Sequence, residues 1–577
     1  ASYNTAVGYF ALTANTTGHT NTAVGPNALN SNTTGSTNIA IGSASLHQNT
    51  TGTLNVAIGV SSLYANTTAS NNTAVGFSSL NANTTGTRNT AVGSNALDAN
   101  TTGNYNSAFG THAGTSITTG TTNSVFGDYA LAATTTGTSN SAFGQAALGA
   151  NTTASNNTAV GYASLGANTT GTQNVSLGAN SLDANTTASY NTGLGYNTLT
   201  TNITGEKNVA AGTYSLNSNT TGDDNTALGY ASLYSNTTAD NNTAVGHSAL
   251  TGNTTGANNT AVGKTALATN TTASYNTAVG YQALNLNTTG AGNTASGYGA
   301  MYTNTSGSSN VAIGREALES NTTASNNTAV GFDALTDNTT GAANTATGKN
   351  ALASNTNGGP NVANGFYALE ANTTGGSNVA VGSNSLEFNI TGSNNTAVGK
   401  SSLGANTTGV QNVAVGKGAL TANTTASSNT GLGFQALGSN TTGYSNAAVG
   451  QNALYTNTTG HSNSAFGLSA LTANTTGAGN VALGHQSLHA QTTAAANTAI
   501  GNNAGKEITT GGYNVFVGEE SGSYSTNTIT GIQNTFLGSY TGGTASNTTR
   551  ANVIGHGVVG ESEYTTIGSG TSDIRAA

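Results

Sequence analysis

The sequence predicts an all-β protein, a parallel β-solenoid or β-roll whose coils are 17 residues long. Residues 4–8, NTAVG, return at residues 21–25, and the spacing then holds up to Gly518. A fixed period of this kind marks a repeat architecture, in which each unit packs on its neighbours. A 17-residue unit rich in Gly, Asn and Thr has too little helix propensity to form helices. We therefore expect one stack of β coils.

We number the positions of each coil from 1 to 17, beginning at the Asn, which is Asn4 in the first coil. The consensus is Asn, Thr or Val, Ala, Val or Ile, Gly, two variable residues, Ala or Ser, Leu, two variable residues, Asn-Thr-Thr, Gly or Ala, and two variable residues. Positions 2–4 alternate as a short strand does, with positions 2 and 4 on one face. A turn, a second strand near the Ala-Leu pair at positions 8 and 9, and a turn near Asn-Thr-Thr-Gly are expected to complete the coil.

Two columns of the repeat are constant. Gly at position 5 predicts a positive φ or a backbone approach too close for a Cβ; the first members of this structural turn are Gly8, Gly25, Gly42, Gly59 and Gly76. Asn at position 1, repeated at ~4.8 Å, predicts a ladder of side-chain amides that satisfies turn backbone groups. The first members of this Asn ladder are Asn4, Asn21, Asn38, Asn55 and Asn72.

Two variable columns indicate how the interior is packed. Ala replaces the Gly of position 15 in several coils, so that turn is expected to have an ordinary φ; the replacements are Ala69, Ala154, Ala188, Ala239, Ala273, Ala324, Ala426 and Ala494. Where the Leu of position 9 becomes Gly, at Gly114 and Gly505, position 12 becomes Ile117 and Ile508. The apolar volume moves instead of disappearing, as a close-packed interior requires.

Departures from the repeat define the domain organisation. Four coils lack the branched residue of position 4 and are expected to be weak points; they carry Ala211, Ser296, Thr347 and Asn364. After Gly518 the spacing of the constant Gly changes to 20, then 17, then 13 residues, ending at Gly568. We therefore assign residues 1–518 to the solenoid array and 519–577 to irregular terminal coils and a C-terminal cap, which protects the last edge of a solenoid.

Composition excludes several function classes. Charged residues make up 5% of the chain and the net charge is −9, so nothing favours nucleic acid or an anionic membrane as a partner. No stretch approaches the ~18 apolar residues of a membrane span, so membrane insertion is not expected. Cys is absent, which excludes disulfides and thiolate metal sites. The chain starts inside a repeat, so we expect a processed, cropped or continued N-terminus.

The balance of side-chain sizes predicts an oligomer. The small residues of positions 3 and 8 suit a narrow roll, and its apolar content is thin for a tube that stands alone. The larger side chains of positions 2 and 4 are then free to pack against neighbouring chains. We expect a homotrimer with itself as partner, about 33 coils long and, at ~4.8 Å per coil, roughly 160 Å.

Two family resemblances support this architecture. The unit Asn-Thr-Ala-Val-Gly-x-x-Ala resembles the head repeat of trimeric autotransporter adhesins, which implies a left-handed parallel β-roll of three chains. This repeat is about three residues longer, in the Asn-Thr-Thr turn, and no coiled-coil stalk or membrane anchor is recognisable.

The second resemblance covers essentially the whole chain. Long arrays of Asn-Thr-Ala-Val-Gly-x-x-Ala-Leu-x-x-Asn-Thr-Thr-Gly look like bacterial surface and tail-fibre-like proteins that end in an endosialidase-type intramolecular chaperone. Residues 552–557 and 565–570 resemble the segment that precedes this domain. The resemblance implies a fibre trimerised by a chaperone that then cleaves itself off, and an end at Ala577 fits such cleavage.

The Asn-x-Thr/Ser pattern at positions 12–14 is an N-glycosylation acceptor pattern. Candidate glycan sites in the first coils are Asn15, Asn32, Asn49, Asn66, Asn83 and Asn100. The alternative is a turn in which the Asn and Thr side chains bond the backbone, and that alternative stands beside the glycan hypothesis.

Two further columns have a functional and a structural interpretation. Position 6 is often aromatic, as in Tyr9, Phe77, Tyr162, Tyr230, Tyr281 and Phe332; we interpret these rings as corner filling, with stacking on sugars as the alternative. The Thr-Thr turn repeats along one edge and makes ice binding a third hypothesis. The eight His residues have no ligand spacing, and we find no catalytic or metal-binding constellation, so no enzyme activity and no cofactor are expected.

These observations predict a structural protein: an extracellular or cell-surface fibre that acts as a spacer, stalk or filament subunit. The alternative is an adhesin shaft or phage tail fibre that binds a surface glycan, which would place the chain on a virion. A receptor tip would be a separate non-repeating domain, and the sequence shows none.

Overall fold

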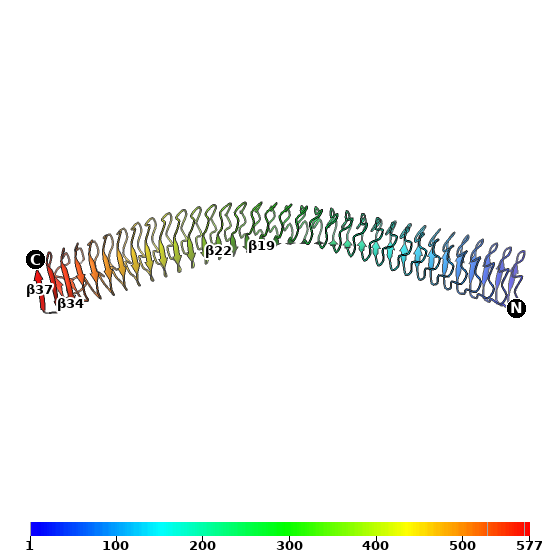
Figure 1. The fold of residues 1–577 in the computed structure, drawn as a ribbon, viewed down its shortest axis with the longest axis horizontal. Coiled ribbons are helices and arrows are strands. Elements are labelled where there is room, and N and C mark those ends of the chain that lie inside the picture. The colour runs from blue at the N-terminus through cyan, green and yellow to red at the C-terminus, as the bar shows by residue number, and fades with distance from the viewer. Residues whose placement is uncertain (1, 528, 571) are drawn as a thin grey trace. The chain divides into compact units, whose positions relative to one another are not determined.

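A computed structural model describes residues 2–527, 529–570 and 572–577. It contains two compact units, Ala1–Thr289 and Gly290–Ala577. Within each unit, strands lie side by side in parallel and one coil of chain joins each strand to the next (Figure 1). The predicted fold class, an all-β parallel β-solenoid of 17-residue coils, is confirmed. The boundary that the sequence suggests at residue 518 lies inside the second unit.

Seventeen strands form the first unit. They are β1 (Thr5–Val7), β2 (Thr22–Val24), β3 (Ile39–Ile41), β4 (Val56–Ile58), β5 (Thr73–Val75), β6 (Thr90–Val92), β7 (Ser107–Phe109), β8 (Ser124–Phe126), β9 (Ser141–Phe143), β10 (Thr158–Val160), β11 (Val175–Leu177), β12 (Thr192–Leu194), β13 (Val209–Ala211), β14 (Thr226–Leu228), β15 (Thr243–Val245), β16 (Thr260–Val262) and β17 (Thr277–Val279).

The described part of the second unit contains twenty strands, fifteen at positions equivalent to those of the first unit and five in a less regular end. They are β18 (Thr294–Ser296), β19 (Val311–Ile313), β20 (Thr328–Val330), β21 (Thr345–Thr347), β22 (Val362–Asn364), β23 (Val379–Val381), β24 (Thr396–Val398), β25 (Val413–Val415), β26 (Thr430–Leu432), β27 (Ala447–Val449), β28 (Ser464–Phe466), β29 (Val481–Leu483), β30 (Thr498–Ile500), β31 (Val515–Val517), β32 (Thr535–Leu537), β33 (Gly542–Gly543), β34 (Asn552–His556), β35 (Val559–Gly560), β36 (Thr565–Ser569) and β37 (Ser572–Ala576).

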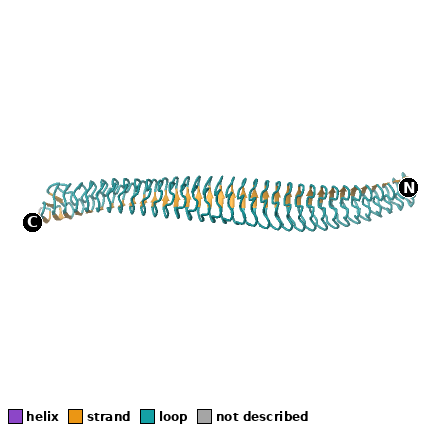
Figure 2. Cartoon of the chain, turned by 90° about the horizontal axis from the view of Figure 1, so that it is seen from above, coloured by secondary structure: helices purple, strands orange, loops and turns teal. Residues whose placement is uncertain are grey.

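Each regular coil contains one strand, at positions 2–4, and turns make up the rest (Figure 2). The second strand expected near Ala-Leu does not occur in the described coils. There the chain forms tight turns with positive φ at positions 7 and 9, as at Asn27 (φ 59°) and Leu29 (φ 50°). A third positive φ falls at position 17, for example at Thr37. The Leu backbone still pairs between coils, because its N–H donates to the position 8 carbonyl of the next coil.

Within each unit, strand register is the same at successive steps of the regular array. Position 2 faces position 2 and position 4 faces position 4, as in the pairing of β2 with β3. Identical side chains therefore lie one above another along each unit, which turns every sequence column into a spatial column.

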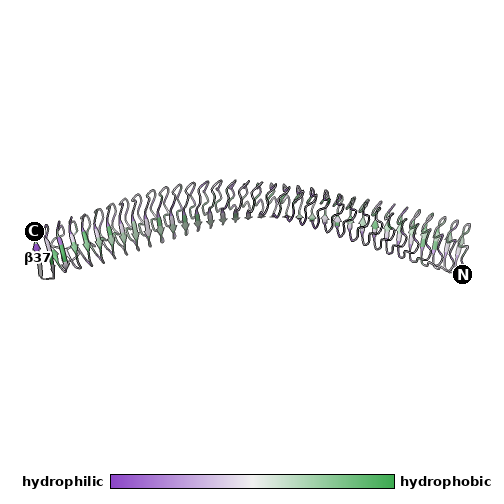
Figure 3. Ribbon diagram, viewed as in Figure 1, coloured by the Kyte–Doolittle hydropathy of each residue, from purple (hydrophilic) through white to green (hydrophobic). Residues whose placement is uncertain are grey.

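The interior of each coil is very narrow. The side chains of positions 3, 8 and 9 point inward and are fully buried, as Ala23, Ala28 and Leu29 show. Positions 2 and 4 point outward and remain partly exposed, and several of these strands stand out in green in Figure 3. Small residues therefore fill the roll and larger ones cover one outer face, as predicted.

The outward direction of position 4 removes the core-packing reason behind one expectation. Ala211, Ser296, Thr347 and Asn364 were expected to weaken their coils. These side chains do not enter the core, and β13 and β22 keep the common parallel register with the buried residue of position 3 in place. These coils interrupt an outer surface instead.

The exchange of apolar volume between positions 9 and 12 is confirmed. A Cβ on Gly114 would lie 2.9 Å from Cδ1 of Ile117, which is fully buried and fills the space of the missing Leu. A Cβ on Gly505 would lie 2.7 Å from Cδ2 of Phe516, a buried ring at position 3 of the next coil. Removing Leu in that coil makes room for a larger residue above it.

The end of the second unit departs from the 17-residue period as the sequence indicates. β32 pairs with β34 and β34 with β36, both in parallel. The last strand, β37, pairs with β36 in the antiparallel direction and covers its edge. β37 therefore occupies the backbone hydrogen-bonding groups on that side of β36.

Candidate functional site

The Asn residues of position 1 lie in one buried column that closes every coil. The Nδ2 of Asn21 donates to the carbonyl of Gly35, at position 15 of the same coil, over 2.9 Å. The backbone N–H of Asn21 donates to Oδ1 of Asn4 over 2.8 Å, and that of Asn38 donates to Oδ1 of Asn21 over 3.0 Å. Asn55 and Asn72 repeat the pattern. The column therefore acts as a structural ladder between coils.

The Gly residues of position 5 lie beside this ladder where two coils approach closely. Gly25 has a φ of 132°, and a Cβ there would lie 2.6 Å from the carbonyl oxygen of Gly42. Gly8, Gly59 and Gly76 have the same conformation and the same close approach. Both reasons anticipated for a constant Gly apply together. Gly35, at position 15, has no positive φ, as the Ala replacements suggest.

The candidate glycan sites at position 12 form a second amide column. Nδ2 of Asn32 donates to Oδ1 of Asn15 and to the carbonyl of Gly35. Nδ2 of Asn49 donates in the same way to Asn32, and that of Asn66 to Asn49. The column continues through Asn83 and Asn100.

Burial decides between the two interpretations of this column. Asn32, Asn49, Asn66, Asn83 and Asn100 are fully buried, and Asn15 in the first coil is partly buried. A sugar on Nδ2 would displace an amide hydrogen bond and the neighbouring coil. The geometry therefore opposes glycosylation of the folded chain and supports the alternative, in which the amide bonds the turn.

Within each unit, the outward side chains of positions 2 and 4 form a surface that we call the strand stripe. It is mostly apolar and partly exposed; for example, Leu177 is 50% exposed and Ile313 43%. In β7, β8 and β9 the residues Phe109, Phe126 and Phe143 stack with ring centroids 4.7 Å apart and planes 8° apart. An exposed apolar surface that continues over many coils marks an interaction site.

The aromatic residues of position 6 do not fill a corner, which corrects that interpretation. Tyr9, Phe77, Tyr162, Tyr230, Tyr281 and Phe332 are all exposed, between 39% and 71%. They stand on the outer surface beside the strand stripe. In the second unit they alternate with cations in one column: Arg315 lies between Tyr298 and Phe332, and Lys349 between Phe332 and Phe366.

The Thr-Thr turn presents one exposed row. At position 13 the hydroxyl is engaged, since Oγ1 of Thr33 donates to the carbonyl of Thr50 and Oγ1 of Thr50 to that of Thr67. At position 14 the side chains of Thr34 and Thr51 are exposed. A single row of Thr beside variable neighbours does not make a broad flat face, so the geometry adds no support to ice binding.

A small group of carboxylates lies on the outer surface of the second unit. Desolvation by burial, together with repulsion from Glu316, Asp333 and Asp337, raises the pKa of Glu319. Desolvation and the charge of Glu316 raise the pKa of Asp333. Arg315 pairs with Glu316 over 3.0 Å and opposes both shifts. Among the described residues, no three His, Asp or Glu side chains converge as a metal site would require.

In the part of the chain that the structure describes, no helix has the length and apolar character needed to cross a bilayer.

No protein-family model, curated protein or solved structure matches this chain. The fold and its columns of side chains define the class: a β-solenoid repeat protein.

Proposed function

We propose that this chain is a structural protein, a stiff segment of an extracellular or cell-surface fibre built from copies of the chain itself. The observation that supports this most is the unbroken register of each unit, in which coils bond to one another through strands and, in most coils, through two buried amide columns. A repeat protein with identical neighbour contacts resists bending in the same way at every coil.

The bonding within one coil step explains the stiffness. Along the strand, backbone groups pair in parallel, and the Leu of position 9 and the Thr of position 13 add backbone bonds to the next coil, as Leu29 and Thr33 do. The amides of Asn38 and Asn49 add side-chain bonds inside the roll, where little water competes. Bending a unit would stretch several of these bonds at once.

The strand stripe supports self-association as a homotrimer. Its side chains project outward from every regular coil, so copies aligned along their length would bury the stripe continuously. A surface of this kind pairs best with another of the same spacing, and a second copy of the chain supplies that spacing. The sparse Lys and Arg residues, 10 in 577, leave few sites for trypsin-like proteases outside a cell.

Mass per length tests the proposal. Electron microscopy of the purified full chain, with light scattering for the particle mass, is expected to show straight particles with three chains side by side. Particles with the mass of a single chain at every concentration would contradict the homotrimer. Flexible particles that bend over a few coils would contradict the structural role.

A further inference from the structure

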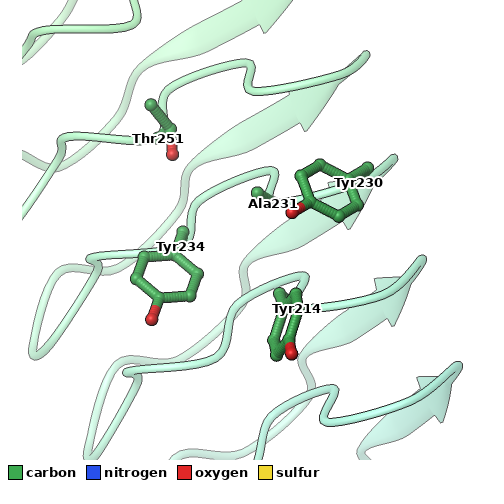
Figure 4. Close-up of a pocket in the computed structure, with 5 residues that line it drawn as sticks. All are labelled: Tyr214, Tyr230, Ala231, Tyr234 and Thr251. Carbon is green, nitrogen blue, oxygen red and sulfur yellow. The ribbon is translucent and has the colours of Figure 1, made fainter.

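A pocket of about 290 Å³ opens on the outer surface of the first unit, across three consecutive coils (Figure 4). It is lined by Tyr214, Tyr230, Ala231, Tyr234 and Thr251. Tyr214 comes from the coil of β13, the next three residues from the coil of β14, and Thr251 from the coil of β15.

The pocket exists because of one small residue among large ones. Position 7 carries Tyr214 in one coil and Ala231 in the next. Since Ala231 has only a methyl group, the space above Tyr214 stays open. Tyr230 at position 6 and Tyr234 at position 10 stand on either side of that space.

The tyrosine rings that line the pocket pack against one another. Tyr214 meets Tyr230 edge-on, with centroids 6.1 Å apart and planes at 86°, and meets Tyr234 at 6.3 Å and 77°. Tyr196 packs on Tyr214 from the preceding coil, and His247 stacks on Tyr230 from the following coil. Side chains fixed in this way lose little conformational entropy when a ligand binds.

The lining offers aromatic surface and hydroxyl groups without charge. Among the described residues, no hydrogen bond joins the hydroxyls of Tyr214, Tyr230, Tyr234 and Thr251 to another group of the protein. An uncharged ligand with apolar faces and many hydroxyls matches these groups.

We propose that this pocket binds one or two rings of a neutral saccharide. The C–H face of a pyranose packs on the exposed surface of Tyr234 or Tyr230, and its hydroxyls pair with the tyrosine and Thr251 hydroxyls. The volume lies near the lower end, ~300 Å³, of pockets that hold small molecules. The site is a lateral one, on the side of the solenoid.

Cationic ligands fit the pocket less well. Aromatic faces do attract cations, and elsewhere the chain pairs its rings with its own cations, as Lys264 does with Tyr281 at 5.9 Å. The pocket lining, however, contains no carboxylate to balance a cation, whereas its four hydroxyls suit a polyol.

The proposal stands apart from the fibre function. Mass and stiffness test the fibre, whereas ligand binding tests the pocket, so failure of either leaves the other intact.

Saturation-transfer NMR on the full chain provides the test, with cellotetraose, chitotetraose and maltotetraose as neutral probes and tetramethylammonium as the cationic probe. Two variants remove the site. Tyr234→Thr deletes one wall, and Ala231→Tyr fills the space with a residue that position 7 already accepts at Tyr129 and Tyr367. The matched controls make the same changes in other coils at the same positions: Tyr64→Thr and Ala163→Tyr.

We expect at least one neutral oligosaccharide to bind the wild-type chain. Both pocket variants should weaken that binding by about tenfold or more, as loss of a central aromatic contact does, and both controls should bind as the wild type does. Circular dichroism establishes that all four variants are folded. The proposal is overturned if no neutral probe binds, if the controls lose binding as much as the pocket variants do, or if only tetramethylammonium binds.

Discussion

Gly at position 5 combines a positive φ with a close approach of the next coil. Gly246 has a φ of 132°, and a Cβ there would lie 2.6 Å from the carbonyl oxygen of Gly263. We expect Gly246→Ala to lower the free energy of unfolding by at least about 2 kcal/mol, since it adds backbone strain and a contact with backbone that cannot move aside. Urea unfolding followed by circular dichroism measures the change.

The control for this substitution is Gly256→Ala in the same coil. Gly256 occupies position 15, has no positive φ, and stands in a column where Ala replaces Gly in several coils. A Cβ there would also lie close to backbone, 2.2 Å from the carbonyl oxygen of Ala273, so the two sites differ mainly in φ. Because the chain accepts Ala in that column, this substitution is expected to cost less than Gly246→Ala does. Equal losses at both sites would show that the left-handed conformation does not set the constancy of position 5.

The amide column of position 12 gives a second prediction at the residue scale. Asn219 donates to Oδ1 of Asn202 and to the carbonyl of Gly222, and its Oδ1 accepts from Asn236. Asn219→Ala breaks all three bonds inside the roll and should cost about 2–3 kcal/mol, as buried unpaired polar groups do.

Asn219→Thr is the matched variant, because the chain already contains Thr in this column. Oγ1 of Thr134 donates to the carbonyl of Asn151 and accepts from Nδ2 of Asn151. Thr at position 219 should therefore restore part of the loss in urea unfolding. A Thr variant as unstable as the Ala variant would mean that hydrogen bonding is not what the column contributes.

At the scale of the coil, substitutions can reverse the exchange of side-chain volume between Gly505 and Phe516 of the next coil. Gly505→Leu restores the consensus, but its side chain would collide with Phe516 and Leu488. We expect a loss of about 3 kcal/mol in the free energy of unfolding. Adding Ile508→Asn and Phe516→Ala restores the consensus residues and should recover most of the lost free energy of unfolding.

Thermal and urea unfolding of the single, double and triple variants give the coupling between these sites. If the changes in the free energy of unfolding are simply additive, residues 505, 508 and 516 do not fill one shared space. That result would contradict the proposed exchange of volume. The natural counterpart is Gly114, where the residue above is Val125 and no large ring enters.

The carboxylates of the coils that follow β19 and β20 predict an unusual pH dependence. Burial raises the pKa of Glu319 and of Asp333, and neighbouring carboxylates add to both shifts. A raised pKa in the folded state means that stability is greatest below the unfolded pKa, about 4, and is lost as the pH rises through the folded value. Unfolding should therefore become harder as the pH falls from about 7 to about 4.

Glu319→Gln removes the loss of stability that the ionised carboxylate of Glu319 causes at neutral pH. The variant is expected to unfold at higher urea concentration than the wild type at neutral pH, and the difference should close near pH ~4, where the wild-type carboxyl becomes protonated. Glu206→Gln, in a different column, serves as the control for the loss of one surface carboxylate. A difference that grows as the pH falls would have the wrong sign for a raised pKa.

At the scale of the whole molecule, the sequence predicts the fold well because its strongest signals are columns. Position 5 marks a backbone conformation and position 3 marks a narrow interior, and both meanings follow from residue size. The prediction of a second strand was wrong because the sequence gives no sign that a Leu such as Leu29 has a left-handed backbone conformation.

The outer surface was harder to predict, since exposure depends on the direction of a side chain from a turn. Aromatic residues at position 6, such as Tyr230, were expected to fill corners and instead face solvent. The pocket was missed for a related reason. The pocket is visible in the sequence only when neighbouring coils are compared, because position 7 changes from Tyr214 in one coil to Ala231 in the next. A consensus averages over the coils and hides such differences.

The strand stripe gives the prediction for the whole assembly. Association through apolar side chains is expected to change little with NaCl between about 0.05 and 0.5 M, because screening acts on charges. It should weaken on cooling, because hydrophobic association weakens at low temperature. Sedimentation velocity of the full chain at several salt concentrations and temperatures measures both effects.

A single coil provides the matched pair of variants for this prediction. Phe126→Lys places a charge in the stripe, within the stack of Phe109, Phe126 and Phe143, whereas Thr136→Lys places it on the exposed row of position 14. The first is expected to shift the chain toward monomer and the second to leave the mass unchanged, with both folded by circular dichroism. Dissociation by salt, or equal effects of the two Lys residues, would locate the interface elsewhere than the strand stripe.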